Sequence, residues 1–240
     1  MNRPLASFIR RLTMFYWDPT YILLLPGLIL AMIAQAMVQN AYSKYSRVET
    51  RSGAAGVQVA QTLLQSYGVN DVEVVMGKGQ LTDHYNPKSK QIVLSPGVYR
   101  SSSIASQAIA AHETGHAIQH SEAYIPLSFR SFLSPGVQIS SAAALPLFFI
   151  GLVMGSYPLT QIGIYLFTAV VIFQLVTLPV ELNASRRALL ALDGQGFLTH
   201  DEYPMARKVL SAAALTYVAS LAVSLLQLYR LMVLSGRRRR

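Results

Sequence analysis

Cysteine is absent from the 240 residues of this chain. Without a thiol the chain can form neither a disulfide nor a thiolate metal site, so any metal must be held by His, Asp or Glu. The absence does not indicate a redox compartment, because a chain without thiols suits either an oxidising or a reducing one.

Charged side chains are also scarce. They make up 13% of the chain, about half the usual share of a soluble domain, whereas hydrophobic residues reach 52%. A soluble domain would not leave its surface so poor in charge, so we expect lipid to be the solvent for much of it. The net charge of +9 comes from 20 Lys and Arg against 11 acidic residues. Because the Arg residues border apolar runs, contact with lipid headgroups and a role in topology are favoured over nucleic-acid binding.

Three long stretches contain no charge and predict four membrane spans. At roughly 20 residues per span, the longest stretch holds two helices, at about 137–154 and 159–179, with a break at the turn-forming residues 155–158. The three stretches are residues 19–43, 131–179 and 209–229.

A basic and aromatic leader, residues 1–17, precedes the first span, and its Tyr16 and Trp17 suit a membrane interface. A cleaved signal peptide is the alternative interpretation. The apolar run is long for a signal peptide and lacks a clear small-x-small cleavage site, so a retained anchor is favoured.

Two polar islands, residues 44–130 and 181–208, lie between the spans. The larger one predicts a helix that stops at Gly68, a strand at 72–76, and two short strands around the turn at 86–88. Serines 101–103 are N-cap candidates for a further helix from about Ile104 to His120. The smaller island begins with a helical pattern that stops at Gly194 and Gly196.

The helix at 104–120 carries the strongest chemical signal, His112-Glu113-Thr114-Gly115-His116. Two His residues four apart on a helix project from one face and can share one ion. Glu113 is placed to take a proton from a metal-activated water and to pass it to a leaving amine. Chance would produce this pattern in about three of a thousand such chains, so coincidence is the weaker interpretation.

Two other residues of this helix carry information. Gly115 costs about 1 kcal/mol in helix propensity, which indicates that something packs closely against it. His120 continues the same face but lies about 12 Å along the axis from His112, too far to share its ion. A polar helix end or a substrate contact is the expected role of His120.

A zinc site of this kind needs a third protein ligand. Glu122 points away from His112, and His200 and Glu202 lie in a loop-like stretch. Glu181 is the favoured candidate, because it ends an apolar span where an unpaired carboxylate is costly. The alternative for Glu181 is an interfacial carboxylate that caps a new helix or pairs with Arg186 or Arg187.

This sequence contains five distinctive segments: LTDHYNPKSKQIVLS, AAHETGHAIQH, YIPLSFRS, TLPVELNASRRAL and KVLSAAALTYVA. They resemble the YugP-type neutral zinc metallopeptidases, a family of small bacterial membrane proteins, and more distantly the HtpX and CAAX-prenyl protease group. The resemblance implies one Zn²⁺ held by His112, His116 and Glu181, with Glu113 as the general base. It also implies a gluzincin-like peptidase in a bacterial cell membrane that acts on peptides or proteins, membrane proteins among them.

One position departs from the distant relatives. The HtpX-like group has an Asp four residues after the ligand Glu, and this chain has Ser185 there. Asn183 and Asp83 are the candidates to replace that carboxylate beside the imidazoles.

The predicted hairpin carries two candidate substrate-binding residues, His84 and Tyr85. It matches the place where HtpX-like relatives have an edge strand, to which an extended peptide can add through backbone hydrogen bonds. Either side chain could also polarise the scissile carbonyl. A polar turn network at 82–85 is an equally good interpretation.

The expected fold is predominantly α: a polytopic helical membrane protein of about four spans with a small α+β, zincin-like region. Its segments are 1–43 with the leader and first span, 44–130 with the zincin region, 131–180 with two spans, 181–208 with the third-ligand helix, and 209–240 with the last span and an Arg tail. An even number of spans puts both islands on one side of the membrane. Basic residues lie near the span ends in both the islands and the termini, so the distribution of positive charge does not determine whether the islands face the cytoplasm.

The function predicted from these observations is zinc-dependent endopeptidase activity inside a membrane. A zinc-binding scaffold or pseudoprotease without turnover is the main alternative, and the intact Glu113 counts against it. A basic binding module for nucleic acid or acidic lipid is a second alternative. The lack of interleaved aromatic and basic residues on any one predicted surface argues against nucleic acid as its ligand. The sequence predicts neither the oligomeric state nor the cleavage specificity.

Overall fold

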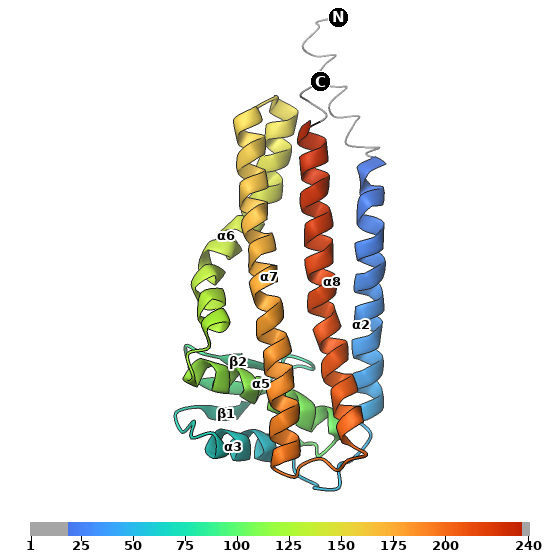
Figure 1. Ribbon diagram of the computed structural model, residues 1–240, viewed down its shortest axis with the longest axis vertical. Helices are drawn as coiled ribbons and strands as arrows, with labels where there is room; N and C mark the ends of the chain where they lie inside the picture. Colours follow the sequence, from blue (N-terminus) through green and yellow to red (C-terminus); the bar gives the residue numbers. More distant parts are fainter. Residues whose placement is uncertain (1–18, 237–240) are drawn as a thin grey trace, which may run out of the picture. The chain divides into compact units, whose positions relative to one another are not determined.

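The computed structural model describes residues 19–236, so the predicted leader and Arg tail lie outside the described residues. The chain forms, in order, η1 (Pro19–Leu24), α2 (Leu25–Tyr45), α3 (Gly56–Ser66), β1 (Glu73–Met76), β2 (His84–Asn86), β3 (Gln91–Leu94), α4 (Pro96–Arg100), α5 (Ile104–Ser121), α6 (Ile125–Met154), α7 (Tyr157–Gly194) and α8 (Tyr203–Gly236), as Figure 1 shows.

Among residues 19–236, four helical segments are long and apolar enough to cross a membrane. They are Pro19–Tyr45, Ile125–Met154, Tyr157–Gly194 and Tyr203–Gly236. Together with the small sheet, they confirm the predicted fold class of a polytopic helical membrane protein with an α+β region. The predicted break between the second and third spans is also confirmed, because Gly155 adopts a positive φ of 80° between α6 and α7.

Helix α7 corrects one expectation. The sequence predicted a span that ends at Pro179 and a new helix that starts at Glu181, but α7 continues through both over 38 residues. Proline inside a helix removes one backbone hydrogen bond and does not by itself end the helix when its flanks are well packed. At 1.5 Å per residue α7 is about 57 Å long, against about 30 Å of bilayer hydrocarbon. Its charged end therefore extends beyond the lipid tails.

The described part of the chain divides into two compact units, and the first comprises residues 19–32, 130–176 and 218–236. Its apolar core includes Phe148, Ile164 and Leu231. Helices α6 and α7 cross closely there, because a Cβ atom on Gly163 would lie 2.6 Å from the backbone nitrogen of Phe148. Small residues at such crossings are typical of helices packed in lipid, where van der Waals contact drives association.

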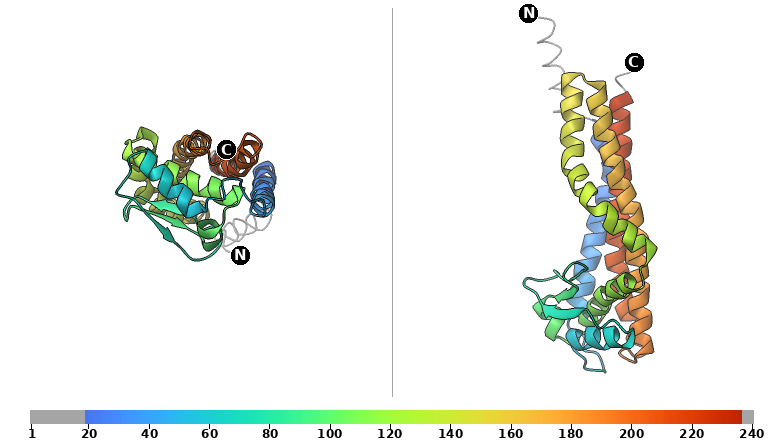
Figure 2. Two further views of the ribbon diagram at one scale, coloured as in Figure 1. Left: turned by 90° about the horizontal axis from the view of Figure 1, so that it is seen from below. Right: turned by 90° about the vertical axis from the view of Figure 1, so that its left-hand side faces the viewer.

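The second unit comprises residues 33–129 and 177–217 and contains the sheet. The strand order is β1-β3-β2, with β1 parallel and β2 antiparallel to β3. The predicted strand pair around residues 86–88 is therefore confirmed, and β2 lies at one edge of the sheet. Helices α3 and α5 cover one face of the sheet (Figure 2), where Val74 and Ile92 pack with Leu64 and Ala117.

Helix α5 is buried on its other side as well. Small residues of α5, Ala108 and Ala111, pack against Ala188 and Leu192 of α7 and Leu210 of α8. Alanine lets helices approach closely while retaining a high helix propensity. Because it is enclosed by the sheet on one side and by helices on the other, α5 has a fixed position for the residues that it carries.

Glu202 ties the start of α8 to a distant loop. Its carboxylate accepts backbone N–H bonds from Arg51 and Thr199, both at 2.8 Å. Burial alone would raise the pKa of Glu202, but these N–H donors hold it below its ordinary value. Glu202, considered above as a metal ligand, is therefore an acceptor for two backbone N–H groups of loops instead.

Candidate metal centre

Helix α5 begins where the sequence predicts. The Ser103 hydroxyl oxygen accepts a hydrogen bond from the Ser106 backbone N–H at 3.2 Å and caps the helix. The helix then runs to Ser121 without a break. His112 and His116 therefore lie one turn apart on one face, with ring centroids 4.8 Å apart in an edge-to-face arrangement.

Glu181 of α7 faces both imidazoles. Its Oε2 lies 3.3 Å from Nε2 of His112 and 3.4 Å from Nε2 of His116. One potential ligand atom from each of the three residues lies within 4.8 Å of the others. The structure thus brings together the three residues that the sequence analysis proposed as metal ligands.

These separations suit a metal better than direct hydrogen bonds. Charge-assisted N–H···O⁻ bonds are about 2.7–2.9 Å long. In a tetrahedral zinc site with bonds of about 2.0–2.1 Å, neighbouring ligand atoms lie about 3.3–3.4 Å apart. Two imidazole nitrogens and a carboxylate oxygen are also a ligand set that zinc accepts in catalytic sites, which leave one position open. The residues present therefore fit a zinc ion.

The cluster is buried and negatively charged. Glu181 is 2% exposed and Glu113 is 8% exposed, so both carboxylates need a compensating positive charge. Burial alone would lower the pKa of His116, but the carboxylates of Glu181 and Glu113 raise it above its ordinary value. Two carboxylates next to two imidazoles create an electrostatic potential that favours a divalent cation.

The Nδ1 atom of each His residue has a hydrogen-bond partner. His112 Nδ1 lies 3.2 Å from the Ser185 hydroxyl oxygen, and His116 Nδ1 lies 3.0 Å from Oε1 of Gln119. Both Nε2 atoms remain directed at Glu181. Ser185, where the distant relatives have Asp, thus contacts the imidazole itself.

The two residues proposed to replace that Asp have other partners. Asn183 accepts a hydrogen bond from Gln119 at 2.9 Å, so it acts one step away from His116. Asp83 accepts the Ser95 backbone N–H at 2.7 Å. Gln119 was not predicted from the sequence, although its position three residues after His116 is the i, i+3 spacing at which helical side chains meet.

Gly115 lies at a close approach of α5 and α7. A Cβ atom on Gly115 would lie 2.9 Å from the Ala184 carbonyl oxygen. The expectation that another group approaches closely at Gly115 is confirmed, and that group is the backbone of the helix that carries Glu181.

Arg187, one of the residues considered as a partner for Glu181, has other interactions. Its Nη1 donates to Glu122 Oε2 at 2.6 Å, and its Nε donates to Asn183 Oδ1 at 2.8 Å. Glu122 is therefore an ion-pair partner at the end of α5, consistent with the expectation that it points away from His112.

The candidate substrate-binding residues lie on the edge strand β2. His84 is exposed, and its Nδ1 is 2.8 Å from the Thr82 carbonyl oxygen, a local contact of the kind expected for a polar turn. Tyr85 is half-buried, and its hydroxyl lies 2.8 Å from His120 Nδ1. His120 thus links the C-terminal half of α5 to the edge strand.

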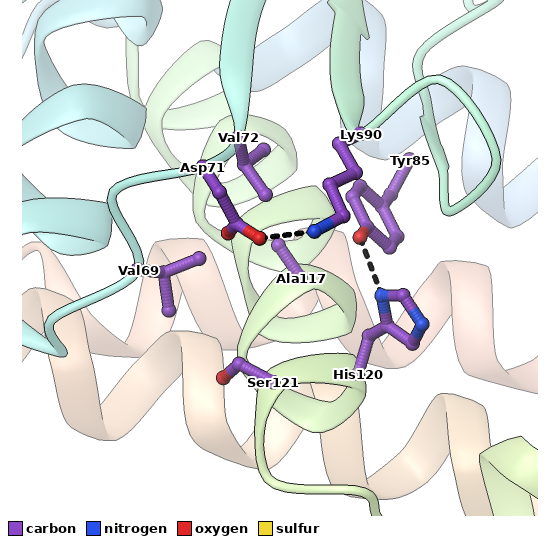
Figure 3. A pocket seen from close by; sticks show the side chains of 8 residues that line it. All are labelled: Val69, Asp71, Val72, Tyr85, Lys90, Ala117, His120 and Ser121. Carbon is purple, nitrogen blue, oxygen red and sulfur yellow. Dashed lines mark hydrogen bonds and ion pairs between the residues drawn. The ribbon is translucent and has the colours of Figure 1, made fainter.

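Tyr85 and His120 line one side of a cavity of about 140 Å³ (Figure 3). The ion pair of Asp71 and Lys90 and the side chain of Ala117 of α5 also line this cavity. The opposite charges of Asp71 and Lys90 compensate each other there.

Comparison with known proteins identifies relatives along nearly the whole chain. Residues 20–236 match the family described as "Putative neutral zinc metallopeptidase". The chain is also 45% identical over 217 residues to the "Putative membrane protease YugP" of Bacillus subtilis (strain 168), an alignment that covers 90% of this chain and 96% of that protein. No solved structure matches the chain significantly.

Proposed function

This chain belongs to the neutral zinc metallopeptidase family, and we propose that it is a membrane-embedded zinc endopeptidase. The observation that carries the proposal is the distance of 3.3–3.4 Å from one Glu181 oxygen to the Nε2 atoms of His112 and His116. We propose that these three residues hold one zinc ion in a gluzincin-like site.

A zinc ion bound there would act as a Lewis acid that lowers the pKa of water and polarises a peptide carbonyl. Glu113 follows the first ligand directly in the sequence and is largely buried. We propose that its carboxylate accepts a proton from the attacking water and then delivers it to the nitrogen of the leaving amine. General acid–base catalysis of this kind contributes about 10²–10⁴-fold to a rate.

The edge strand β2 provides a place for the substrate backbone. It pairs with β3 on one side, and in the sheet of the described residues it has no strand on the other. An extended peptide can add to such an edge through backbone hydrogen bonds. We propose that His84 and Tyr85 contact the substrate there and that the cavity beside Tyr85 receives one of its side chains.

The setting suggests peptides or proteins near a membrane, membrane proteins among them, as substrates. The four apolar helices anchor the chain in a bilayer, and the charged end of α7, which carries Glu181, extends beyond the lipid tails. The bacterial relative supports assignment to a bacterial cell membrane. A zinc-binding scaffold without turnover would not need a buried carboxylate at Glu113.

The ligand assignment is tested by zinc content and peptide cleavage of purified full-length protein. We expect Glu181→Gln to lose most of its zinc and its cleavage of a casein or membrane-protein substrate, because the neutral amide is a poor ligand. Glu73→Gln is the matched control, since Glu73 is an exposed carboxylate on β1. Wild-type zinc content in Glu181→Gln would contradict the proposal.

A further inference from the structure

A line of polar side chains connects His116 to the surface. Gln119 is 0% exposed, and its Oε1 lies 3.0 Å from Nδ1 of His116. The Nε2 of Gln119 donates to the Val180 carbonyl oxygen and to Asn183 Oδ1, both at 2.9 Å. Beyond Asn183 lies Arg187, whose Nε donates to the same Oδ1 at 2.8 Å.

The orientation of each amide follows from Arg187. A guanidinium can only donate hydrogen bonds, so the Asn183 atom that faces it must be the carbonyl oxygen. That oxygen, together with the Val180 carbonyl, requires that Gln119 present its NH₂ group to them. The remaining amide atom, Oε1, is then the one that faces His116.

The orientation of the Gln119 amide determines which ring nitrogen of His116 carries the hydrogen. Oε1 of Gln119 can only accept, so Nδ1 of His116 must carry the hydrogen. The lone pair of the neutral ring is then on Nε2, the atom that lies 3.4 Å from Glu181. A reversed Gln119 amide would bring its oxygen against two carbonyl oxygens in a buried place and would favour the wrong tautomer of His116.

Arg187 is itself held at its outer end. Its Nη1 donates to Glu122 at 2.6 Å, and its guanidinium carbon lies 5.8 Å from the centroid of the Tyr124 ring. Both partners belong to the short connection that follows α5. The connection and α7 therefore fix Arg187, and through it the amide beside the candidate zinc ligand.

We infer that Gln119, Asn183 and Arg187 are positioning residues that hold His116 in the tautomer required for zinc binding through Nε2. The inference rests on the proposed zinc site and assigns these residues no contact with the reacting atoms. Partners of this kind typically contribute 10–100-fold to metal affinity.

The test measures the zinc dissociation constant of the full-length protein by competition with a fluorescent chelator. We expect Asn183→Leu to weaken zinc binding about 10–100-fold, because Gln119 loses the side-chain acceptor of the two that orient it and the link to Arg187 is broken. Asn183→Asp should bind zinc like wild type, because its carboxylate accepts the same two hydrogen bonds. Arg187→Met should weaken binding, whereas Arg186→Met, which alters an exposed neighbour on the same helix, should not.

The pair of arginine variants keeps the test decisive if Asn183→Leu does not fold. Wild-type zinc affinity in a folded Asn183→Leu variant or in Arg187→Met would overturn the inference, as would equal weakening in Asn183→Asp and Asn183→Leu. With any of these outcomes, the wild-type protein still binds zinc and the proposed function stands. A wild-type protein that binds no zinc would overturn both.

Discussion

At the scale of single residues, the candidate site depends on what holds each imidazole. His112 contacts the Ser185 hydroxyl, and His116 contacts the Gln119 amide. Neither partner is a carboxylate, so neither raises the basicity of its imidazole as strongly as an Asp would. Substitutions at these partner residues are therefore expected to strengthen zinc binding in some cases and to weaken it in others.

Changes at Ser185 test this account of His112. We expect Ser185→Ala to weaken zinc binding about 10-fold, because His112 loses the partner that orients it. Ser185→Asp should bind zinc more tightly than Ser185→Ala, because a carboxylate is a stronger acceptor for an Nδ1–H group. The measurement is the zinc dissociation constant, with Ser89→Ala in the exposed β2–β3 turn as control. Equal affinity in all four proteins would remove Ser185 from the site.

The sequence predicted the residues of the site better than their partners. His112, Glu113 and His116 could be identified because they belong to one local motif on one helix. Glu181 could be identified because a carboxylate at the end of an apolar span needs a partner. The contacts from Ser185 to His112 and from Gln119 to Asn183 join residues 73 and 64 positions apart. No local pattern encodes such contacts, because they depend on how α5 packs against α7.

At the scale of elements, the contact of α5 with α7 brings the ligands together. Gly115 permits that contact, because any larger residue would meet the Ala184 carbonyl oxygen. The start of α5 was predictable from Ser103, a local capping signal. The continuity of α7 was not, because Pro179 and Glu181 interrupt the apolar pattern without interrupting the helix.

Gly115→Ala tests the importance of this close approach. The added Cβ would lie 2.9 Å from the Ala184 carbonyl oxygen, so α5 must shift away from Glu181. We expect a loss of about 1–3 kcal/mol in stability and weaker zinc binding, measured by thermal unfolding and by chelator competition. Gly136→Ala is the control, since a Cβ atom there would meet nothing within 4 Å. Unchanged unfolding and zinc affinity in Gly115→Ala would argue against a close α5–α7 contact.

At the scale of the whole molecule, the membrane topology decides where substrates are met. If all four apolar helices of the described residues cross the bilayer, both polar islands lie on one side and the α6–α7 connection lies on the other. The absence of native cysteine makes this directly measurable, because a single introduced cysteine is the only thiol in the chain.

We expect Ser89→Cys in the β2–β3 turn and Gln195→Cys after α7 to react with a membrane-impermeant maleimide from the same side. Met154→Cys, at the exposed end of α6, should react from the opposite side. The experiment uses intact cells and inverted vesicles in parallel. The side from which Ser89→Cys and Gln195→Cys both react is the side that carries the site. Labelling of the two cysteines from different sides would rule out the four-span topology.

The proposed catalytic role of Glu113 is the central claim, and one measurement tests it most directly. It is the rate of peptide hydrolysis per bound zinc in Glu113→Gln and in wild type. Glu113→Gln preserves the shape of the side chain but cannot accept the proton, so we expect full zinc content and a rate at least about 100-fold lower. Hydrolysis at the wild-type rate by zinc-loaded Glu113→Gln would contradict the mechanism.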